Sequence, residues 1–194
     1  MNKKNKKLII LIILILIIII GIYLIIPKQK EEPLKQDSSE NEFQNKQLQS
    51  QTFEIKETNN PERKLYIDSQ YNFSFQYPSS FVINKFQEAE NTSTILVQEK
   101  ETKKSFQIFI SYFDEPGPLT KERILKDLPD LKIENPQQRV LKNGIVALIF
   151  FSEESSIGKT REIWFVYKDN LYQISTYKEL DQLTAQMLQT WEFN

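Results

Sequence analysis

The sequence contains no cysteine and no histidine. The lack of cysteine excludes disulfides, thiolate metal ligands, a cysteine nucleophile and the acylated cysteine of a lipoprotein anchor. The lack of histidine removes the imidazole ligand of metal sites and the side chain that most often exchanges protons near neutral pH. Most common catalytic designs are thereby excluded, and we expect no catalytic residue, no cofactor and no metal site.

The chain also has no excess of basic charge. Its formal net charge is -1, and Lys3, Lys4, Lys6 and Lys7 all precede the first apolar run, so the remainder carries -5. A domain that binds nucleic acid is expected to present a basic surface. We therefore predict that nucleic acid is not a partner.

One long hydrophobic run stands out. Residues Leu8 to Ile26 contain no charged side chain and consist almost entirely of leucine and isoleucine. As a helix this run spans about 28 Å, close to the hydrocarbon thickness of a bilayer. A helix in a soluble protein has no reason to be apolar on every face. The run predicts a transmembrane helix, with the lipid bilayer as partner through Leu8 to Ile26.

The flanks of this run predict its orientation. The basic tail of residues 1–7 is expected to stay in the cytoplasm, so the rest of the chain lies outside the membrane. A cleavable signal peptide would have an apolar region of about 7 to 15 residues and small residues at the cleavage site. We predict an uncleaved signal anchor (8–26), a flexible polar stalk (27–63) and an extracytoplasmic domain (64–194) of a single-pass protein of the cell membrane.

The stretch YNFSFQYP indicates a strand with one buried face. Tyr71, Phe73, Phe75 and Tyr77 alternate with polar residues, and Pro78 is expected to end the strand because it has no amide hydrogen. We favour core packing over a stacking platform for these aromatic rings. Further strands are predicted at residues 94–98, 105–112, 138–142, 145–153, 161–168 and 171–177.

Turn residues make the predicted sheet antiparallel. Asn143-Gly144 and Asp169-Asn170 each separate two apolar strands, as in β-hairpins. Thr120 is positioned to cap a short helix over residues 121–128. A second helix is predicted at the C-terminus, where one apolar stripe contains Leu180, Leu183, Met187, Leu188 and Trp191. These elements predict an α+β domain with an antiparallel sheet flanked by helices, an α/β/α sandwich preceded by the transmembrane helix.

Several of these segments together resemble PsbP-like domains. The resemblance rests on FSFQYPSSF, a strand near Phe106, the helix start at Leu119-Thr120, Asn143-Gly144, Tyr172-Gln-Ile174 and the final segment Met187 to Phe193. It covers about Leu65 to Phe193, and the composition is typical of a bacterial protein. It implies an extracytoplasmic binding or assembly-assisting module rather than an enzyme. The metal-binding features of plant members are not matched here.

Several sharper motifs also have plain structural explanations. The acidic pairs Asp114-Glu115, Asp127-Asp130 and Glu153-Glu154 fit solvated loop charge better than a glycosidase pair. The run SSIGKT, from Ser155 to Thr160, lacks the spacing of a phosphate-binding loop and fits a hairpin connection. Trp164 and Trp191 are candidate partner anchors, but Trp164 lies between Ile163 and Phe165 in a strand with two apolar faces, which favours burial on both sides.

A membrane-anchored, non-catalytic module that binds a protein or a component of the cell envelope is therefore the expected function. Two alternatives stay open. One is an extracytoplasmic hydrolase with an unrecognised carboxylate or Ser-Lys site. The other is a structural or sensory subunit of a membrane complex.

Overall fold

The computed structural model describes residues 52–115, 117–142, 144–154 and 158–194, and Thr52 to Asn194 form one compact unit. The basic tail, the predicted transmembrane helix from Leu8 to Ile26 and most of the stalk lie outside the described residues. Among the described residues, no helix is both long enough and apolar enough to cross a membrane.

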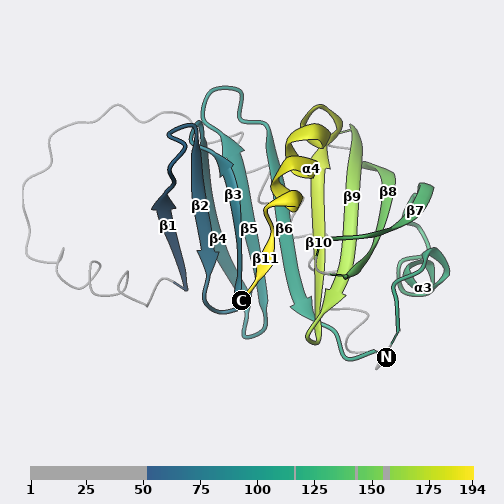
Figure 1. The fold of residues 1–194 in the computed structure, drawn as a ribbon. Helices are drawn as coiled ribbons and strands as arrows, with labels where there is room; N and C mark the ends of the chain where they lie inside the picture. Colours follow the sequence, from purple (N-terminus) through teal and green to yellow (C-terminus); the bar gives the residue numbers. More distant parts are fainter. Residues whose placement is uncertain (1–51, 116, 143, 155–157) are drawn as a thin grey trace, which may run out of the picture. The chain divides into compact units, whose positions relative to one another are not determined.

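Two antiparallel sheets make up most of the domain (Figure 1). The smaller sheet has the order β1-β2-β3-β11, with β1 (Phe53–Glu57), β2 (Arg63–Asp68), β3 (Phe73–Pro78) and β11 (Glu192–Phe193). The larger sheet has the order β4-β5-β6-β10-β9-β8-β7, with β4 (Phe81–Ala89), β5 (Thr92–Glu99), β6 (Ser105–Tyr112), β10 (Asn170–Tyr177), β9 (Gly158–Tyr167), β8 (Val146–Glu154) and β7 (Glu134–Val140).

Two short α-helices accompany the sheets in the described part of the chain. They are α3 (Lys121–Asp127) and α4 (Asp181–Gln189), and a 3₁₀ turn η1 (Lys178–Leu180) leads into α4. In Figure 1, β1 to β3 lie in front of β4 and β5, and α4 lies beside them in front of β6 and β10. The small sheet and α4 therefore form one layer over the large sheet.

An aromatic core fills the space between these layers. Trp191 stacks on Phe73 with 4.4 Å between ring centroids and on Phe75 with 5.4 Å, and Phe165 stacks on Tyr172 at 4.9 Å. All five side chains are almost fully buried. Their rings come from both sheets and from the segment after α4, so they join the two layers.

A second apolar cluster lies on the opposite face of the large sheet. In β9 the residues alternate between the two clusters, with Ile163 and Phe165 in the first and Trp164 in the second. The second cluster also contains Leu119, just before α3, and Ile124 within α3. One end of the large sheet is therefore buried on both faces, as predicted for the strand that carries Trp164.

The predicted fold class is wrong. The domain is mostly β, and the aromatic face of β3 packs inside a two-sheet sandwich rather than beneath flanking helices. The helices of seven and nine residues are too short to cover a face of a seven-stranded sheet. The additional strands β2 and β11 pair with β3, β1 pairs with β2, and the sheet that they form supplies that cover instead.

Several local predictions are confirmed. β3 ends at Pro78, and its aromatic side chains face the core. The Thr120 hydroxyl accepts a hydrogen bond from the Arg123 amide at 3.2 Å and caps α3. The connection around SSIGKT joins the antiparallel strands β8 and β9.

Several boundaries differ from the prediction. The tight turn between β9 and β10 has Lys168 and Asp169 at φ 44° and 59°, one residue earlier than Asp169-Asn170. The C-terminal helix ends at Gln189, because Glu192 and Phe193 pair with β3. β1 also begins at Phe53, within the segment that the sequence assigned to the stalk.

Candidate functional site

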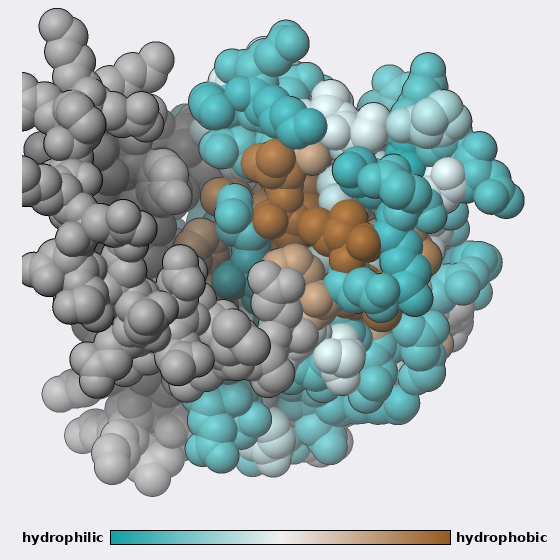
Figure 2. All heavy atoms as spheres, turned by 90° about the vertical axis from the view of Figure 1, so that its left-hand side faces the viewer, coloured by the Kyte–Doolittle hydropathy of each residue, from teal (hydrophilic) through white to brown (hydrophobic). Residues whose placement is uncertain are grey.

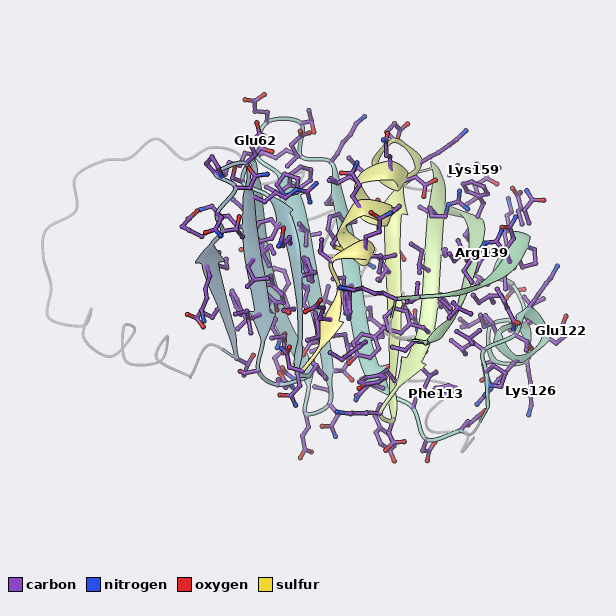
Figure 3. The ribbon with its side chains drawn as sticks, viewed as in Figure 1. Glu62, Phe113, Glu122, Lys126, Arg139 and Lys159 are labelled. Carbon is purple, nitrogen blue, oxygen red and sulfur yellow. The ribbon has the colours of Figure 1, made fainter. Side chains whose placement is uncertain are left out.

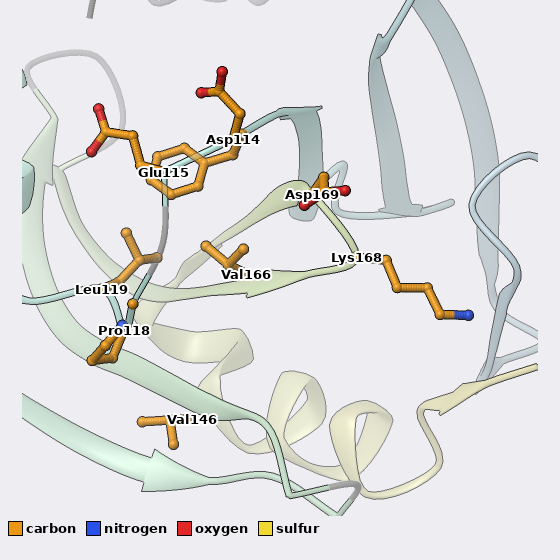
Figure 4. Close-up of a pocket in the computed structure, with 10 residues that line it drawn as sticks. Asp114, Glu115, Pro118, Leu119, Val146, Val166, Lys168 and Asp169 are labelled. Atoms are coloured by element: carbon orange, nitrogen blue, oxygen red, sulfur yellow. The ribbon is translucent and has the colours of Figure 1, made fainter.

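A pocket of about 480 Å³ lies where the loop after β6 approaches β8 and the β9–β10 turn (Figure 4). It is lined by Phe113, Asp114, Glu115, Gly117, Pro118, Leu119, Val146, Val166, Lys168 and Asp169. Most of these residues are exposed or half-buried, so the pocket is open to solvent. It is the candidate site of the domain.

Valine side chains give the pocket an apolar surface. Val146 begins β8 and is 41% exposed, and its β7 partner Val140 is 71% exposed. Val166 of β9 also lines the pocket, and the buried Leu119 adds a further apolar side chain. Large exposed apolar side chains on neighbouring strands lose water contact when a partner covers them, so this surface favours binding.

Three carboxylates line the pocket beside this apolar surface. Asp114 and Glu115 come from the loop after β6, and Asp169 comes from the β9–β10 turn. The Phe113 amide donates to the Asp169 carbonyl oxygen at 2.7 Å, which holds the loop against the turn. Residues more than fifty positions apart in the sequence thus share one rim.

Arg123 of α3 fixes the loop that carries two of these carboxylates. Its Nη2 and Nε donate to Glu115 Oε2 at 2.9 and 3.2 Å, and its Nη1 donates to the Gly117 carbonyl at 3.1 Å. The guanidinium also lies 4.8 Å from the Phe113 ring centroid. Glu115 is therefore committed to an ion pair, whereas Asp114 and Asp169 are exposed at the rim.

The lysine of the pocket does not offset these charges at the rim. Lys168 extends away from the other labelled side chains in Figure 4, and its Nζ lies 5.3 Å from the Tyr167 ring centroid. The rim near Asp114 and Asp169 is consequently acidic. An apolar surface with an acidic rim is suited to a ligand that carries both apolar groups and positive charge.

A second polar cluster, remote from the pocket, is buried between the sheets. Asp68 at the end of β2 is fully buried and accepts four hydrogen bonds. The Tyr66 hydroxyl donates to Oδ2 at 2.8 Å, and the amides of Gln70 and Tyr71 donate to Oδ1 at 3.0 Å. The fourth donor is Lys85 Nζ at 2.8 Å from Oδ2.

Lys85 joins the two sheets through this cluster. Its side chain on β4 is 4% exposed, and its Nζ also donates to Thr52 Oγ1 at 2.8 Å and to Gln70 Oε1 at 3.0 Å. The Tyr71 ring lies 5.1 Å from the same nitrogen. All three donor positions of the ammonium group are used, so this lysine is a structural tie rather than an available nucleophile.

Burial changes the proton affinity of these groups. Desolvation lowers the pKa of Lys85, although the hydrogen bond and the charge of Asp68 act in the opposite direction. Burial, followed by the negative charge of Asp68, raises the pKa of Tyr66 far above its ordinary value. Burial also raises the pKa of Tyr71, against a lowering effect of its hydrogen bond with Ser93.

A buried carboxylate on the other face of the large sheet completes the polar interior. Glu162 accepts hydrogen bonds from Thr160 Oγ1 at 2.6 Å, Trp164 Nε1 at 3.1 Å and Ser175 Oγ at 2.5 Å. Trp164 is 6% exposed and has its indole nitrogen satisfied inside the protein. Its burial agrees with the prediction that it is not a partner anchor.

The acidic pairs singled out in the sequence are not brought together into one site. Asp114 and Glu115 line the pocket, while Asp127 is the last residue of α3 and Asp130 follows the helix. Glu153 forms an exposed ion pair with Lys132. The pocket also includes Asp169, which the sequence suggested only as a turn residue.

The motif SSIGKT does not form a recognisable phosphate site in its described part. Lys159 pairs with Glu134 at 2.7 Å and Thr160 binds Glu162, while Ser155 and Ser156 lie outside the described residues. Within the described ranges, no group of three or more acidic side chains is arranged to hold a metal ion.

The domain is similar in structure to a cyanobacterial PsbP (CyanoP) from Synechocystis sp. PCC 6803, known from a solution structure. The TM-score is 0.49 and the sequence identity is 14%, over 69% of this chain and 93% of the other. No family model matches the chain, and no curated protein matches it.

Proposed function

We propose that the protein is a membrane-anchored binding module, and that its pocket recognises a basic segment with an apolar side chain on a protein partner. The proposal combines the apolar run Leu8 to Ile26, which provides the anchor, with an extracytoplasmic domain of the PsbP-like kind suggested by the sequence. The single observation that carries the binding role is the exposed valine surface bordered by Asp114 and Asp169.

The geometry of the pocket favours binding over hydrolysis. A glycosidase places one carboxylic acid and one carboxylate on opposite sides of the scissile bond. Here Glu115 is held by Arg123, and Asp114 and Asp169 are exposed to solvent. Exposed carboxylates at a rim contribute orientation and long-range attraction to a cationic partner, which is the role proposed for them.

Site-specific photocrosslinking in the native membrane tests this function. A photoreactive amino acid is placed at Val146 in the pocket or at the exposed Glu62 as a control. Figure 3 shows Phe113, beside the pocket, and Glu62 at opposite ends of the domain. We expect one discrete product from position 146 and none from position 62.

Charge dependence separates specific recognition from accidental capture. In the D114N/D169N double variant, two surface charge contacts are lost, so we expect the product at position 146 to fall by about 2- to 30-fold. Glu122→Gln, at an exposed position of α3, is the matched control. Equal products at positions 146 and 62, or a product that does not depend on Asp114 and Asp169, would overturn the proposal.

A further inference from the structure

The strand β1 forms one edge of the small sheet. Among the described residues it pairs with β2 alone, and Figure 1 shows it as the outermost strand of that sheet. The side of the domain near β1 faces the viewer in Figure 2, where apolar surface gathers in a hollow between hydrophilic regions. Ile55, at the middle of β1, is 42% exposed.

The direction of the β1 backbone groups follows from its pairing with β2. The Ser69 amide donates to the Thr52 carbonyl at 2.9 Å, one position beyond the pair Phe53–Asp68. Hydrogen-bonded pairs alternate along an antiparallel ladder, so Glu54 and Lys56 direct their amides and carbonyls toward β2. Phe53, Ile55 and Glu57 then direct theirs outward, where a further strand can pair.

We infer that β1 is a self-complementary edge that pairs with β1 of a second copy of this chain. The two strands run antiparallel about a two-fold axis at Ile55. Each pair then joins one residue from each copy: Ile55 pairs with Ile55, Phe53 with Glu57, and Glu54 with Lys56.

Charge and hydrogen bonding both fit this register. Each Glu54 lies across from the Lys56 of the other copy, and opposite charges in direct cross-strand pairs are stabilising. The outward amides and carbonyls of one copy, at Phe53, Ile55 and Glu57, meet the same groups of the other copy. The ladder of hydrogen bonds between β1 and β2 therefore continues across the two-fold axis. The charge of Glu57 is already compensated by Lys64 of its own chain at 2.9 Å.

The edges of the large sheet lack this suitability. β7 contains Pro136 and a register irregularity, and Arg139 Nη1 donates to the Gln138 carbonyl at 3.1 Å. β4 also has an irregular register, near Gln87. Prolines, bulges and covering charges are common means of preventing edge pairing. β1 pairs with β2 in an unbroken register over all five residues.

A five-residue strand makes a small interface, so the dimer is weak in free solution. Copies attached to the same bilayer have a raised local concentration, which strengthens a weak contact without new interactions. The contact uses the small sheet and no pocket residue. It can therefore hold or fail independently of the proposed binding function.

The natural absence of cysteine allows a direct test in the full chain. Hydrogen-bonded antiparallel partners have Cα atoms about 5.5 Å apart, within the range that a disulfide bridges. Ile55→Cys, reconstituted in bilayer nanodiscs with two copies per disc, is expected to form a disulfide-linked homodimer under mild oxidation. Val140→Cys, which is more exposed in the single chain, is the matched control and is expected to react at least about ten-fold more slowly.

Charge exchange tests the register. In the Ile55→Cys variant, the additional substitution Glu54→Lys places a lysine opposite Lys56 of the other copy on both sides of the axis. We expect this repulsion to lower the rate of crosslinking about ten-fold. Lys56→Glu is expected to behave in the same way, and the E54K/K56E double variant is expected to recover. Equal rates at positions 55 and 140, or a double variant as slow as the single ones, would overturn the inference. Circular dichroism of each variant confirms that the domain is folded.

Discussion

Asp68 is the carboxylate whose removal tests how the two sheets are joined. The substitution Asp68→Asn keeps the size of the side chain and an oxygen that can accept from the Gln70 and Tyr71 amides, both at 3.0 Å. It removes the negative charge next to Lys85, which is 4% exposed. The variant therefore leaves a buried ammonium group without its counter-charge.

The expected loss follows from the separation of the two charges. At 2.8 Å and an effective dielectric constant of about 20, their attraction is about 6 kcal/mol. In the native protein, much of this offsets the desolvation of both ions. When Asp68 is neutralised, the desolvation of Lys85 remains, and we expect the free energy of unfolding to fall by about 3 kcal/mol at pH 7.

The deficit should depend on pH. Desolvation lowers the pKa of Lys85, and Asp68 opposes this effect, so the folded variant should have a still lower lysine pKa. At a pH between the Lys85 pKa of the folded variant and that of the unfolded chain, the unfolded chain binds more protons than the folded one. The free energy of unfolding therefore rises with pH in this range. The deficit of D68N is therefore largest near neutral pH and shrinks as the pH approaches about 9.5, below the ionisation of exposed tyrosines.

Urea unfolding monitored by tryptophan fluorescence provides the measurement. Trp164 and Trp191 are the two tryptophans of the chain, and both lie in this domain, so the signal reports its unfolding in the full chain. Glu192→Gln is the control, because it removes an ion pair with Lys142 in which both side chains are more than half exposed, and no measurable change is expected. A loss below about 1 kcal/mol for D68N, or a loss that does not change with pH, would refute the reasoning.

Three further predictions address the core, the tyrosines and a turn. Trp191→Ala should reduce the free energy of unfolding in urea by about 3 to 5 kcal/mol, because the indole stacks on Phe73 at 4.4 Å within the buried core; a loss below about 1 kcal/mol would contradict this role. Burial raises the pKa of Tyr66 and Tyr172 strongly, so both phenols should stay protonated in the folded protein beyond the ordinary tyrosine pKa. The free energy of unfolding should then decline above pH 10, where the tyrosines of the unfolded chain ionise. A spectrophotometric titration in which all phenols ionise together would argue against this prediction. Lys168→Asn should stabilise the domain by a few tenths to about 1 kcal/mol, since asparagine tolerates the φ of 44° better; thermal unfolding with an unchanged or lower midpoint would exclude this gain.

Local structure could be predicted wherever one side-chain pattern decided it. The alternation in residues 105–112 predicted β6 with the bounds that the structure has. Thr120 predicted the start of α3, because a capping hydroxyl acts within the first turn of a helix. The aromatic face of β3 was also predicted, since a period of two places Phe73, Phe75 and Tyr77 on the same side.

The layer arrangement could not be predicted in the same way. Charged residues interrupt both β1 and β2, and the charged Asp68 at the end of β2 is itself buried, so FEIKE and RKLYID show only a weak alternation and do not predict strands. A strand with a buried aromatic face requires cover, but its pattern is the same whether a helix or a sheet provides it. The apolar stripe at the C-terminus suggested helices for this role. In the structure, Trp191 at the end of that stripe joins the aromatic core just before β11.

The pocket depends on one pairing that periodicity does not reveal. β6 lies next to β10 rather than next to β7, so Tyr112 is opposite Asn170. This pairing brings the loop after β6 against the β9–β10 turn, where the Phe113 amide binds the Asp169 carbonyl. In the sequence, Asp114 was one member of an acidic loop pair and Asp169 a turn residue. Their common position at the rim arises because β7, β8, β9 and β10 pair in chain order and β10 then pairs with β6. The same arrangement places valines of β8 and β9 in the lining of the pocket.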